Sequence, residues 1–158
     1  MQHLLSAAEQ LGLRLRARGE TLAVAESSAG GLIAAVLLAQ PGASAFFLGG
    51  AVVYTAQARA GLLGVTPAEM AGLRSATEPY ALLLARRVRE RLGARWGLAE
   101  TGAAGPAGNR YGDAPGHSCF AVAGPVEATR TLETGNADRL ANMRTFTATA
   151  LALLAELL

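Results

Sequence analysis

Helical and strand-like patterns alternate along the whole chain, and this alternation restricts the fold more than any other feature. Residues 3–18 place leucines and alanines on one helical stripe that stops at Gly19, and the short apolar run 21–25 follows as a strand. The same change of period recurs several times further along. The pattern therefore predicts an α/β domain with helices on both faces of a sheet.

The later elements follow the same reasoning. We expect a buried helix in GLIAAVLLA, short helices within 55–72, a helix with Thr77 as N-cap that ends at Gly93, and a long closing helix that carries Leu140, Met143, Thr147, Ala150, Leu154 and Leu157. Strands are expected at 46–54, at 96–101, at HSCFAVAG and at VEATRTLET. The last two strands can pair as a hairpin across Gly124 and Pro125, which predicts a mixed sheet.

Length and composition indicate one compact domain over residues 1–158. A chain of 158 residues with 51% hydrophobic content can bury a sizeable core. Its apolar runs are broken well before the ~20 residues that a membrane span needs, and its first residues lack a signal-peptide pattern. The single cysteine, Cys119, cannot form a disulfide within the chain. We therefore expect a soluble protein of the reducing cytoplasm with no membrane partner, and the apolar helix faces favour a homo-oligomer.

Two loops of small residues leave strand ends and are the expected place for chemistry. ESSAGG (26–31) runs from a strand into a helix, so its N–H groups and hydroxyls can converge on an anion. TGAAGP (101–106) would let a ligand approach the backbone. From the residues alone, the serine pair is a nucleophile, a phosphate cradle or a helix cap. Neither loop matches a Walker A or dinucleotide motif, so no nucleotide cofactor is predicted.

All 14 basic residues are arginine, and the chain contains no lysine. Arginine offers a planar fork to phosphate or carboxylate, but it cannot give up a proton to serve as a base near neutral pH. Five arginines lie in residues 85–95, where the spacing is that of an amphipathic helix without interleaved aromatics, so no direct nucleic-acid binding is predicted. One cysteine and two separated histidines form no metal-ligand cluster.

Three segments in this order resemble a known family. AESSAGGLIAAVLL (25–38), PGASAFFLGGAVVYTAQARAGLLGV (41–65) and TGAAGPAG (101–108) are similar to the CinA C-terminal domain, also called the nicotinamide-nucleotide amidohydrolase family. The resemblance extends over nearly the whole chain. It implies a three-layer α/β/α sandwich and hydrolysis of the amide of nicotinamide mononucleotide to the acid plus ammonia, with a phosphorylated small molecule as partner.

The resemblance also implies site residues. The family's nucleophilic serine falls on Ser27, its tyrosine on Tyr54, its basic lysine on Arg59 and its second-loop threonine on Thr101. The implied substrate-binding residues lie in the two loops and are Ser28, Gly30, Gly31, Gly102 and Gly105. This sequence departs from the family pattern Glu-Ser-Cys-Thr-Gly-Gly, because Ser28 and Ala29 stand at its cysteine and threonine positions.

The arginine at position 59 leaves the activation of Ser27 open. A lysine can lose its proton when it is desolvated, whereas an arginine stays cationic. One hypothesis is that Arg59 lies beside Tyr54 and favours its tyrosinate form, which then acts as the base. The alternative is a non-catalytic homologue in which Arg59 is a phosphate fork. Glu26 should point to the face opposite Ser27, and His117 either reaches the pocket or is a structural residue.

Two further pairs of residues are weaker candidates. Arg110 and Asp113 occupy a long polar loop that either folds over the site or holds a solvated ion pair. Arg139 and Arg144 lie near the start of the closing helix, and the family resemblance makes one of them a candidate phosphate ligand.

Overall fold

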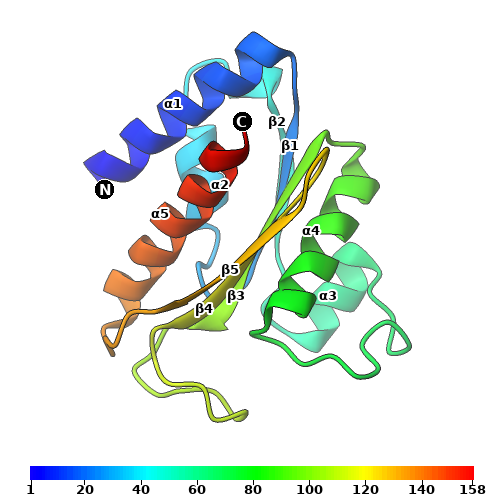
Figure 1. Cartoon of the computed structure of the whole chain (residues 1–158), viewed down its shortest axis with the longest axis vertical. Helices are drawn as coiled ribbons and strands as arrows, with labels where there is room; N and C mark the ends of the chain where they lie inside the picture. The colour runs from blue at the N-terminus through cyan, green and yellow to red at the C-terminus, as the bar shows by residue number, and fades with distance from the viewer.

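The computed structural model describes residues 1–158 and contains one mixed sheet of five strands (Figure 1). Its strands lie in the order β2-β1-β3-β4-β5. They span Leu22–Glu26 (β1), Phe47–Val52 (β2), Trp96–Ala103 (β3), His117–Ala123 (β4) and Ala128–Glu133 (β5). β1 pairs in parallel with both β2 and β3, whereas β4 is antiparallel to β3 and to β5. The predicted mixed sheet is therefore confirmed.

Helices cover both faces of the sheet, as the alternating pattern predicts (Figure 1). One face carries α1 (Gln2–Arg18), α2 (Leu32–Leu38) and α5 (Arg139–Leu157), and the other carries α3 (Ala56–Leu63) and α4 (Glu78–Leu92). A short 3-10 turn, Ala43–Ala45, leads into β2. The three-layer α/β/α arrangement expected for the chain is present.

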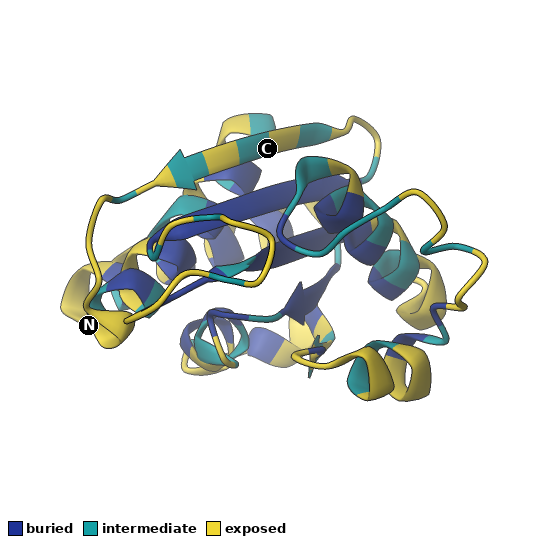
Figure 2. Ribbon diagram, turned by 90° about the horizontal axis from the view of Figure 1, so that it is seen from below, coloured by how far each residue is buried: buried dark blue, intermediate teal, exposed yellow.

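Side-chain alternation along the central strands produces two different cores. On the α1, α2 and α5 side, the strands contribute large side chains such as Val24, Leu98 and Phe120. On the α4 side, the same strands present mostly alanine, and a Cβ at Gly97 would overlap the carbonyl oxygen of Ala85 in α4. The small residues therefore let α4 lie close against the sheet. β5 has alternating exposure, as an edge strand with one free face does (Figure 2).

Most residues that the sequence predicts to begin or end a helix or strand do so in the structure. Gly19 and Gly93 end their helices in the left-handed conformation, with φ of 62° and 64°. Thr77 caps α4 by accepting a hydrogen bond from the Tyr80 N–H at 3.4 Å. The predicted hairpin joins β4 to β5. A second helix within 55–72 was expected, but residues after α3 form turns instead.

Residues Gly49 and Gly50 confirm an irregularity in the first strand pair. Leu22 pairs with Phe47 while the next residue of β1, Ala23, pairs with Gly49, so β2 carries one extra residue there. β2 is an open edge of the sheet, and its Leu48 and Val52 side chains are exposed. The expected homo-oligomer and cytoplasmic location stay predictions. None of the helices is long and apolar enough to cross a membrane.

Candidate functional site

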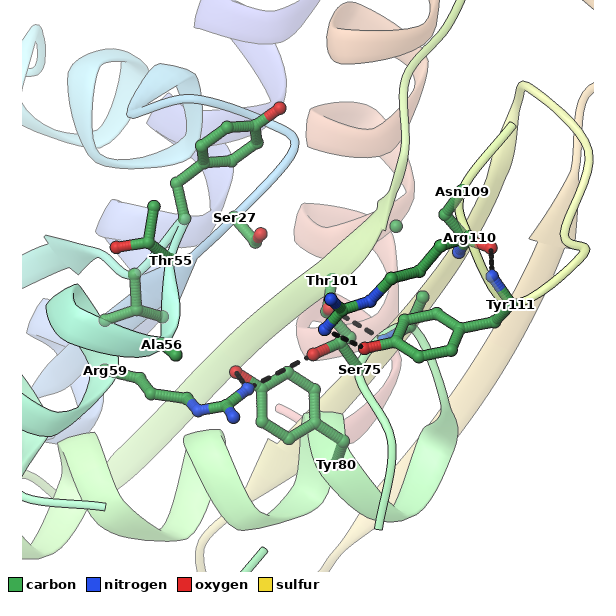
Figure 3. A pocket seen from close by; sticks show the side chains of 14 residues that line it. Ser27, Thr55, Ala56, Arg59, Ser75, Tyr80, Thr101, Asn109, Arg110 and Tyr111 are labelled. Atoms are coloured by element: carbon green, nitrogen blue, oxygen red, sulfur yellow. Dashed lines mark hydrogen bonds between the residues drawn. The ribbon is translucent and has the colours of Figure 1, made fainter. Parts of the chain in front are cut away.

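A cavity of about 340 Å³ opens where β1 and β3 end side by side. All four residues expected to be catalytic, Ser27, Tyr54, Arg59 and Thr101, line it together with Gly102. Figure 3 shows Ser27, Arg59 and Thr101 among the lining residues. The parallel pairing of β1 with β3 brings the two small-residue loops together, because parallel strands end at the same edge of a sheet. The sequence prediction of one shared pocket therefore holds.

Two adjoining cavities hold most of the other candidates. One of about 200 Å³ is lined by Ser28, Gly102, Gly105 and Arg139, and another includes Gly30 with the two serines. Tyr54 lines all three cavities. Gly31 lines none of them, because it is the N-cap residue of α2.

The loop after β1 is held by a buried carboxylate that sequence reasoning missed. Glu100, in β3, is fully buried, and its Oε2 accepts hydrogen bonds from the N–H groups of Ser27 at 3.1 Å and Ala29 at 2.8 Å. Its Oε1 accepts from the hydroxyls of Ser28 and Ser118. Burial raises the pKa of Glu100 above its ordinary value, and the four hydrogen bonds oppose that rise.

Glu100 takes up several of the hydrogen-bond donors of the ESSAGG loop. The sequence predicts that its N–H groups and hydroxyls converge on an anion, and they do, but the anion is the chain's own Glu100. The N–H of Gly30 is also committed, since it donates to the Ser27 carbonyl oxygen at 3.1 Å. The N–H groups of Ser28 and Gly31 and the Ser27 hydroxyl remain without a partner within the protein, so the phosphate-cradle interpretation stays a prediction for these three groups alone.

The helix-cap interpretation of the serines is wrong. α2 begins at Gly31 without a side-chain cap from either serine. Its N-terminus is instead occupied by Glu26, whose Oε1 accepts from the Ile33 N–H at 2.6 Å and whose Oε2 accepts from the Ala34 N–H at 3.3 Å. Burial raises the pKa of Glu26 to about 7, although these N–H groups favour its charged form. As expected from strand alternation, Glu26 points away from the cavity toward α2.

The nucleophile interpretation of the serine pair applies to Ser27. Its side chain is half-buried at the cavity wall, and its hydroxyl has no hydrogen-bond partner within the protein. Ser28, by contrast, is buried, and its hydroxyl is committed to Glu100. Of the two serines, only Ser27 has a hydroxyl free to act on a ligand.

The hypothesis that Arg59 lies on the phenol of Tyr54 is wrong. The Arg59 Nη1 donates to the Ser75 hydroxyl at 3.2 Å and to the Tyr80 hydroxyl at 3.5 Å, and its guanidinium lies over the Tyr80 ring (Figure 3). The cation at Tyr54 is Arg139, whose Nη2 donates to the Tyr54 hydroxyl at 3.2 Å. Helix α5 follows β5 in sequence and places Arg139 there, a contact between residues 85 positions apart that spacing could not reveal.

Thr101 and His117 hold the segment before α4. The Thr101 Oγ1 accepts from the Ala76 N–H at 3.2 Å, and the His117 Nε2 lies 2.8 Å from the Ala76 carbonyl oxygen. Ala76 is the one non-glycine residue with a left-handed backbone, at φ 59°, a conformation that costs free energy unless its surroundings fix it. His117 lines no described cavity near Ser27 and is thus a structural residue.

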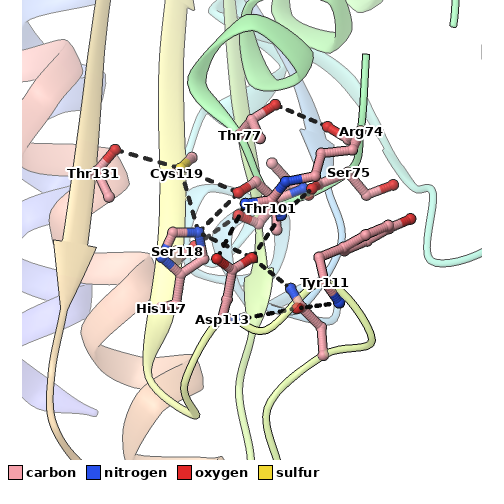
Figure 4. A network of polar contacts seen from close by, with 12 residues as sticks. Arg74, Ser75, Thr77, Thr101, Tyr111, Asp113, His117, Ser118, Cys119 and Thr131 are labelled. Carbon is pink, nitrogen blue, oxygen red and sulfur yellow. Dashed lines mark hydrogen bonds and ion pairs between the residues drawn. The ribbon is translucent and has the colours of Figure 1, made fainter. Parts of the chain in front are cut away.

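The long loop between β3 and β4 folds over the cavity, and its Asn109, Arg110 and Tyr111 line it. Arg110 and Asp113 do not pair with each other. Asp113 instead forms a two-point ion pair with Arg74, at 2.7 and 3.1 Å, beside His117 (Figure 4). The hydrogen bonds from Arg74 lower the pKa of Asp113 to about 2, so this pair ties the loop to the segment before α4. Arg144 is exposed and lines none of these cavities.

Sequence reasoning missed three important groups: Glu100, Ser75 and Tyr80. Only Glu100 carried a usable signal, because a carboxylate within the apolar strand WGLAETGA must be paired when it is buried. Ser75 and Tyr80 lie next to Arg59 only because α4 packs on the sheet behind α3.

Comparisons with known proteins agree on the family. The family model described as the CinA C-terminal domain matches residues 4–158. A CinA-like protein of Synechocystis is 48% identical over 101 residues, which are 64% of this chain and 24% of the relative. A CinA-like protein of Anaeromyxobacter is 42% identical over 145 residues, which are 90% of this chain and 35% of the relative. This chain thus spans about a quarter to a third of the length of these curated relatives.

Solved structures show the same fold. A CinA superfamily protein from Escherichia coli superposes with a TM-score of 0.91 at 29% identity, covering 98% of this chain and 90% of that one. A competence/damage inducible protein from Agrobacterium tumefaciens gives 0.90 at 28% identity, covering 98% and 94%. The α/β fold expected from the sequence is confirmed by both.

We predict that Glu100→Ala lowers the free energy of unfolding by about 3–5 kcal/mol, because the Ser27 and Ala29 N–H groups and the Ser28 hydroxyl lose their acceptor, whereas the Ser118 hydroxyl can still donate to the Thr101 carbonyl oxygen. Glu100→Gln should cost about 1–2 kcal/mol, since its amide oxygen can face the N–H groups while both serine hydroxyls accept from its amide nitrogen. Urea denaturation measures both, with the exposed Glu9→Ala as control. Equal losses for Glu100→Ala and Glu100→Gln would contradict this account.

Glu26 should make stability depend on pH. Its pKa rises from an ordinary 4.5 to about 7 on folding, so the folded state holds its proton more tightly than the unfolded state. The contribution of Glu26 to the free energy of unfolding is therefore fully present below pH 4.5. It is lost as pH rises through 7, which lowers that free energy by on the order of 3 kcal/mol. Urea denaturation from pH 5 to pH 8 should show a smaller fall in Glu26→Gln than in the wild type or in Glu9→Gln. An identical fall in all three proteins would exclude Glu26 as its source.

Proposed function

Since this chain belongs to the CinA C-terminal domain family, we propose that it is an amidohydrolase that cleaves the carboxamide of nicotinamide mononucleotide or a related pyridine nucleotide to the acid plus ammonia. The observation that carries the proposal is the free hydroxyl of Ser27 in the cavity wall. Its loop is fixed by Glu100, so the hydroxyl is held in place before substrate arrives.

The proposed reaction has two halves. The Ser27 Oγ attacks the carboxamide carbon, the hydroxyl proton passes to the amide nitrogen, and the C–N bond breaks to release ammonia and leave an ester on Ser27. Water then hydrolyses this ester, which releases the carboxylic acid and restores the hydroxyl. Tyr54 lines the same cavity and is the proposed carrier of the proton, with Arg139 rather than Arg59 as the cation at its hydroxyl.

The phosphate of the nucleotide is proposed to lie beside Arg139. This side chain lines the second cavity. Its Nη1 donates to the carbonyl oxygen of Gly105, which lines the same cavity, and this hydrogen bond holds the guanidinium there. A guanidinium presents a planar set of donors that matches phosphate oxygens. Tyr54 lines both this cavity and the one that Arg59 lines.

A second function is favoured by the absence of lysine. Arg59 contacts Ser75 and Tyr80 and makes no hydrogen bond with Ser27, and no other group within the protein is hydrogen-bonded to the Ser27 hydroxyl as a base. A pocket with a serine but no strong base fits a homologue that binds a phosphorylated small molecule without turning it over. The two functions differ in one observable product, ammonia.

We predict ammonia release from nicotinamide mononucleotide by the wild type, lost in Ser27→Ala. Arg59→Lys should raise the rate by about 10²–10⁴, because it introduces a side chain that can act as the missing base. Coupled detection of ammonia over several pH values measures all three proteins, with the exposed Arg144→Lys as a matched control.

The outcomes separate the two functions. Ammonia in the wild type that disappears with Ser27→Ala supports the serine amidase. No ammonia above the Ser27→Ala background in the wild type, but release by Arg59→Lys, would favour the non-catalytic binding protein with a disabled site.

A further inference from the structure

Two arginines that face the main cavity have no carboxylate partner. Arg59 and Arg110 both line the cavity, and neither takes part in any of the ion pairs of the structure. No Asp or Glu side chain lines this cavity. Arg74, nearby, shows the contrast, because Asp113 neutralises it. The cavity therefore carries an uncompensated positive charge.

Both guanidinium groups donate to hydroxyl groups at the cavity wall, those of Ser75 and Tyr111. Arg59 donates to the Ser75 hydroxyl at 3.2 Å, and Arg110 donates to the Tyr111 hydroxyl at 3.1 Å and lies over the Tyr111 ring (Figure 3). Hydrogen bonding from Arg110 lowers the pKa of Tyr111, and the charge of Arg59 lowers it further. Both cations thus act on one phenol, although they come from α3 and from the β3–β4 loop.

The surrounding contacts hold the two arginines in place without neutralising them. The guanidinium carbon of Arg59 lies over the ring of the buried Tyr80, 5.5 Å from the ring centroid. The ion pair of Arg74 with Asp113 fixes the loop that carries Arg110. Two like charges beside one cavity repel each other, and an anion between them would be attracted to both and offset that repulsion. Each fork also matches a carboxylate or phosphoryl group.

We propose that Arg59 and Arg110 form an anion subsite that takes a carboxylate or phosphoryl group of the ligand, separate from the group at Arg139. Arg139 lines the two other cavities and not this one. The ligand class is therefore a small molecule with anionic groups at two ends. The acid form of a pyridine mononucleotide, with its phosphate and its carboxylate, fits this class, whereas the amide form lacks the second anion.

The test compares three ligands by isothermal titration calorimetry, all in a Ser27→Ala background so that none is turned over. Nicotinamide mononucleotide has one phosphate, nicotinic acid mononucleotide adds a carboxylate, and nicotinamide adenine dinucleotide adds a second phosphoryl group. We expect at least one of the last two to bind about tenfold more tightly than the first. Arg59→Gln and Arg110→Gln should each remove that gain, and Arg144→Gln should keep it.

Urea denaturation serves as the folding control, because the Arg59 and Arg110 variants should unfold at the same urea concentration as the Ser27→Ala protein. The probe whose gain depends on both arginines identifies the anion as carboxylate or phosphoryl. Equal affinity for all three ligands, a gain that survives both substitutions, or no binding by any ligand at millimolar concentration would overturn the subsite.

This inference rests on the proposed function for its choice of pyridine nucleotides, but the two can fail separately. A wild-type protein that releases no ammonia, and whose Ser27→Ala form shows an arginine-dependent gain, would contradict the amidase and support the subsite. A wild-type protein that releases ammonia but whose Ser27→Ala form binds all three ligands equally would do the reverse.

Discussion

The buried carboxylate of Glu100 is the interaction on which the shape of the site depends. It lies fully buried in the middle of the sheet, and four donors from the Ser27 loop and from β4 surround its two oxygens. Burying such a charge is costly unless every lone pair is used, and here the cost is offset by fixing the turn that presents Ser27. The same carboxylate occupies the anion position that this loop would otherwise offer to a phosphate.

The sheet divides the site into two chemically different sides. Residues of even number in β1 and β3 point toward α2 and α5, which puts Glu26 and Glu100 among large apolar side chains there. Thr101 points the other way, toward α4 and the segment that begins with Arg74. The two carboxylates are thus buried, whereas Arg59 and Arg110 line the cavity. A ligand in the cavity therefore contacts positively charged side chains and no carboxylate.

The use of arginine alone gives this pocket a fixed electrostatic character. A lysine at position 59 could serve as a base, but an arginine stays protonated and offers donors in a plane. Arg59 and Arg110 line the main cavity and Arg139 lines the two adjoining ones, and each is supported by neutral groups rather than by a carboxylate. These cavities are suited to holding anions, and any catalysis in them needs a base other than arginine.

The amino-acid sequence alone predicts the layered α/β fold, the helix ends at Gly19 and Gly93, the hairpin of β4 with β5, and the meeting of the two loops at one cavity. These follow from local periodicity, from capping and from the rule that parallel strands end together. Packing between elements, by contrast, explains why Glu100 accepts hydrogen bonds from the serine loop, why Glu26 caps α2, and why Arg139 rather than Arg59 contacts Tyr54. These contacts join residues from different elements, often far apart along the chain, and their partners depend on how strands and helices pack, which spacing in a single sequence does not encode.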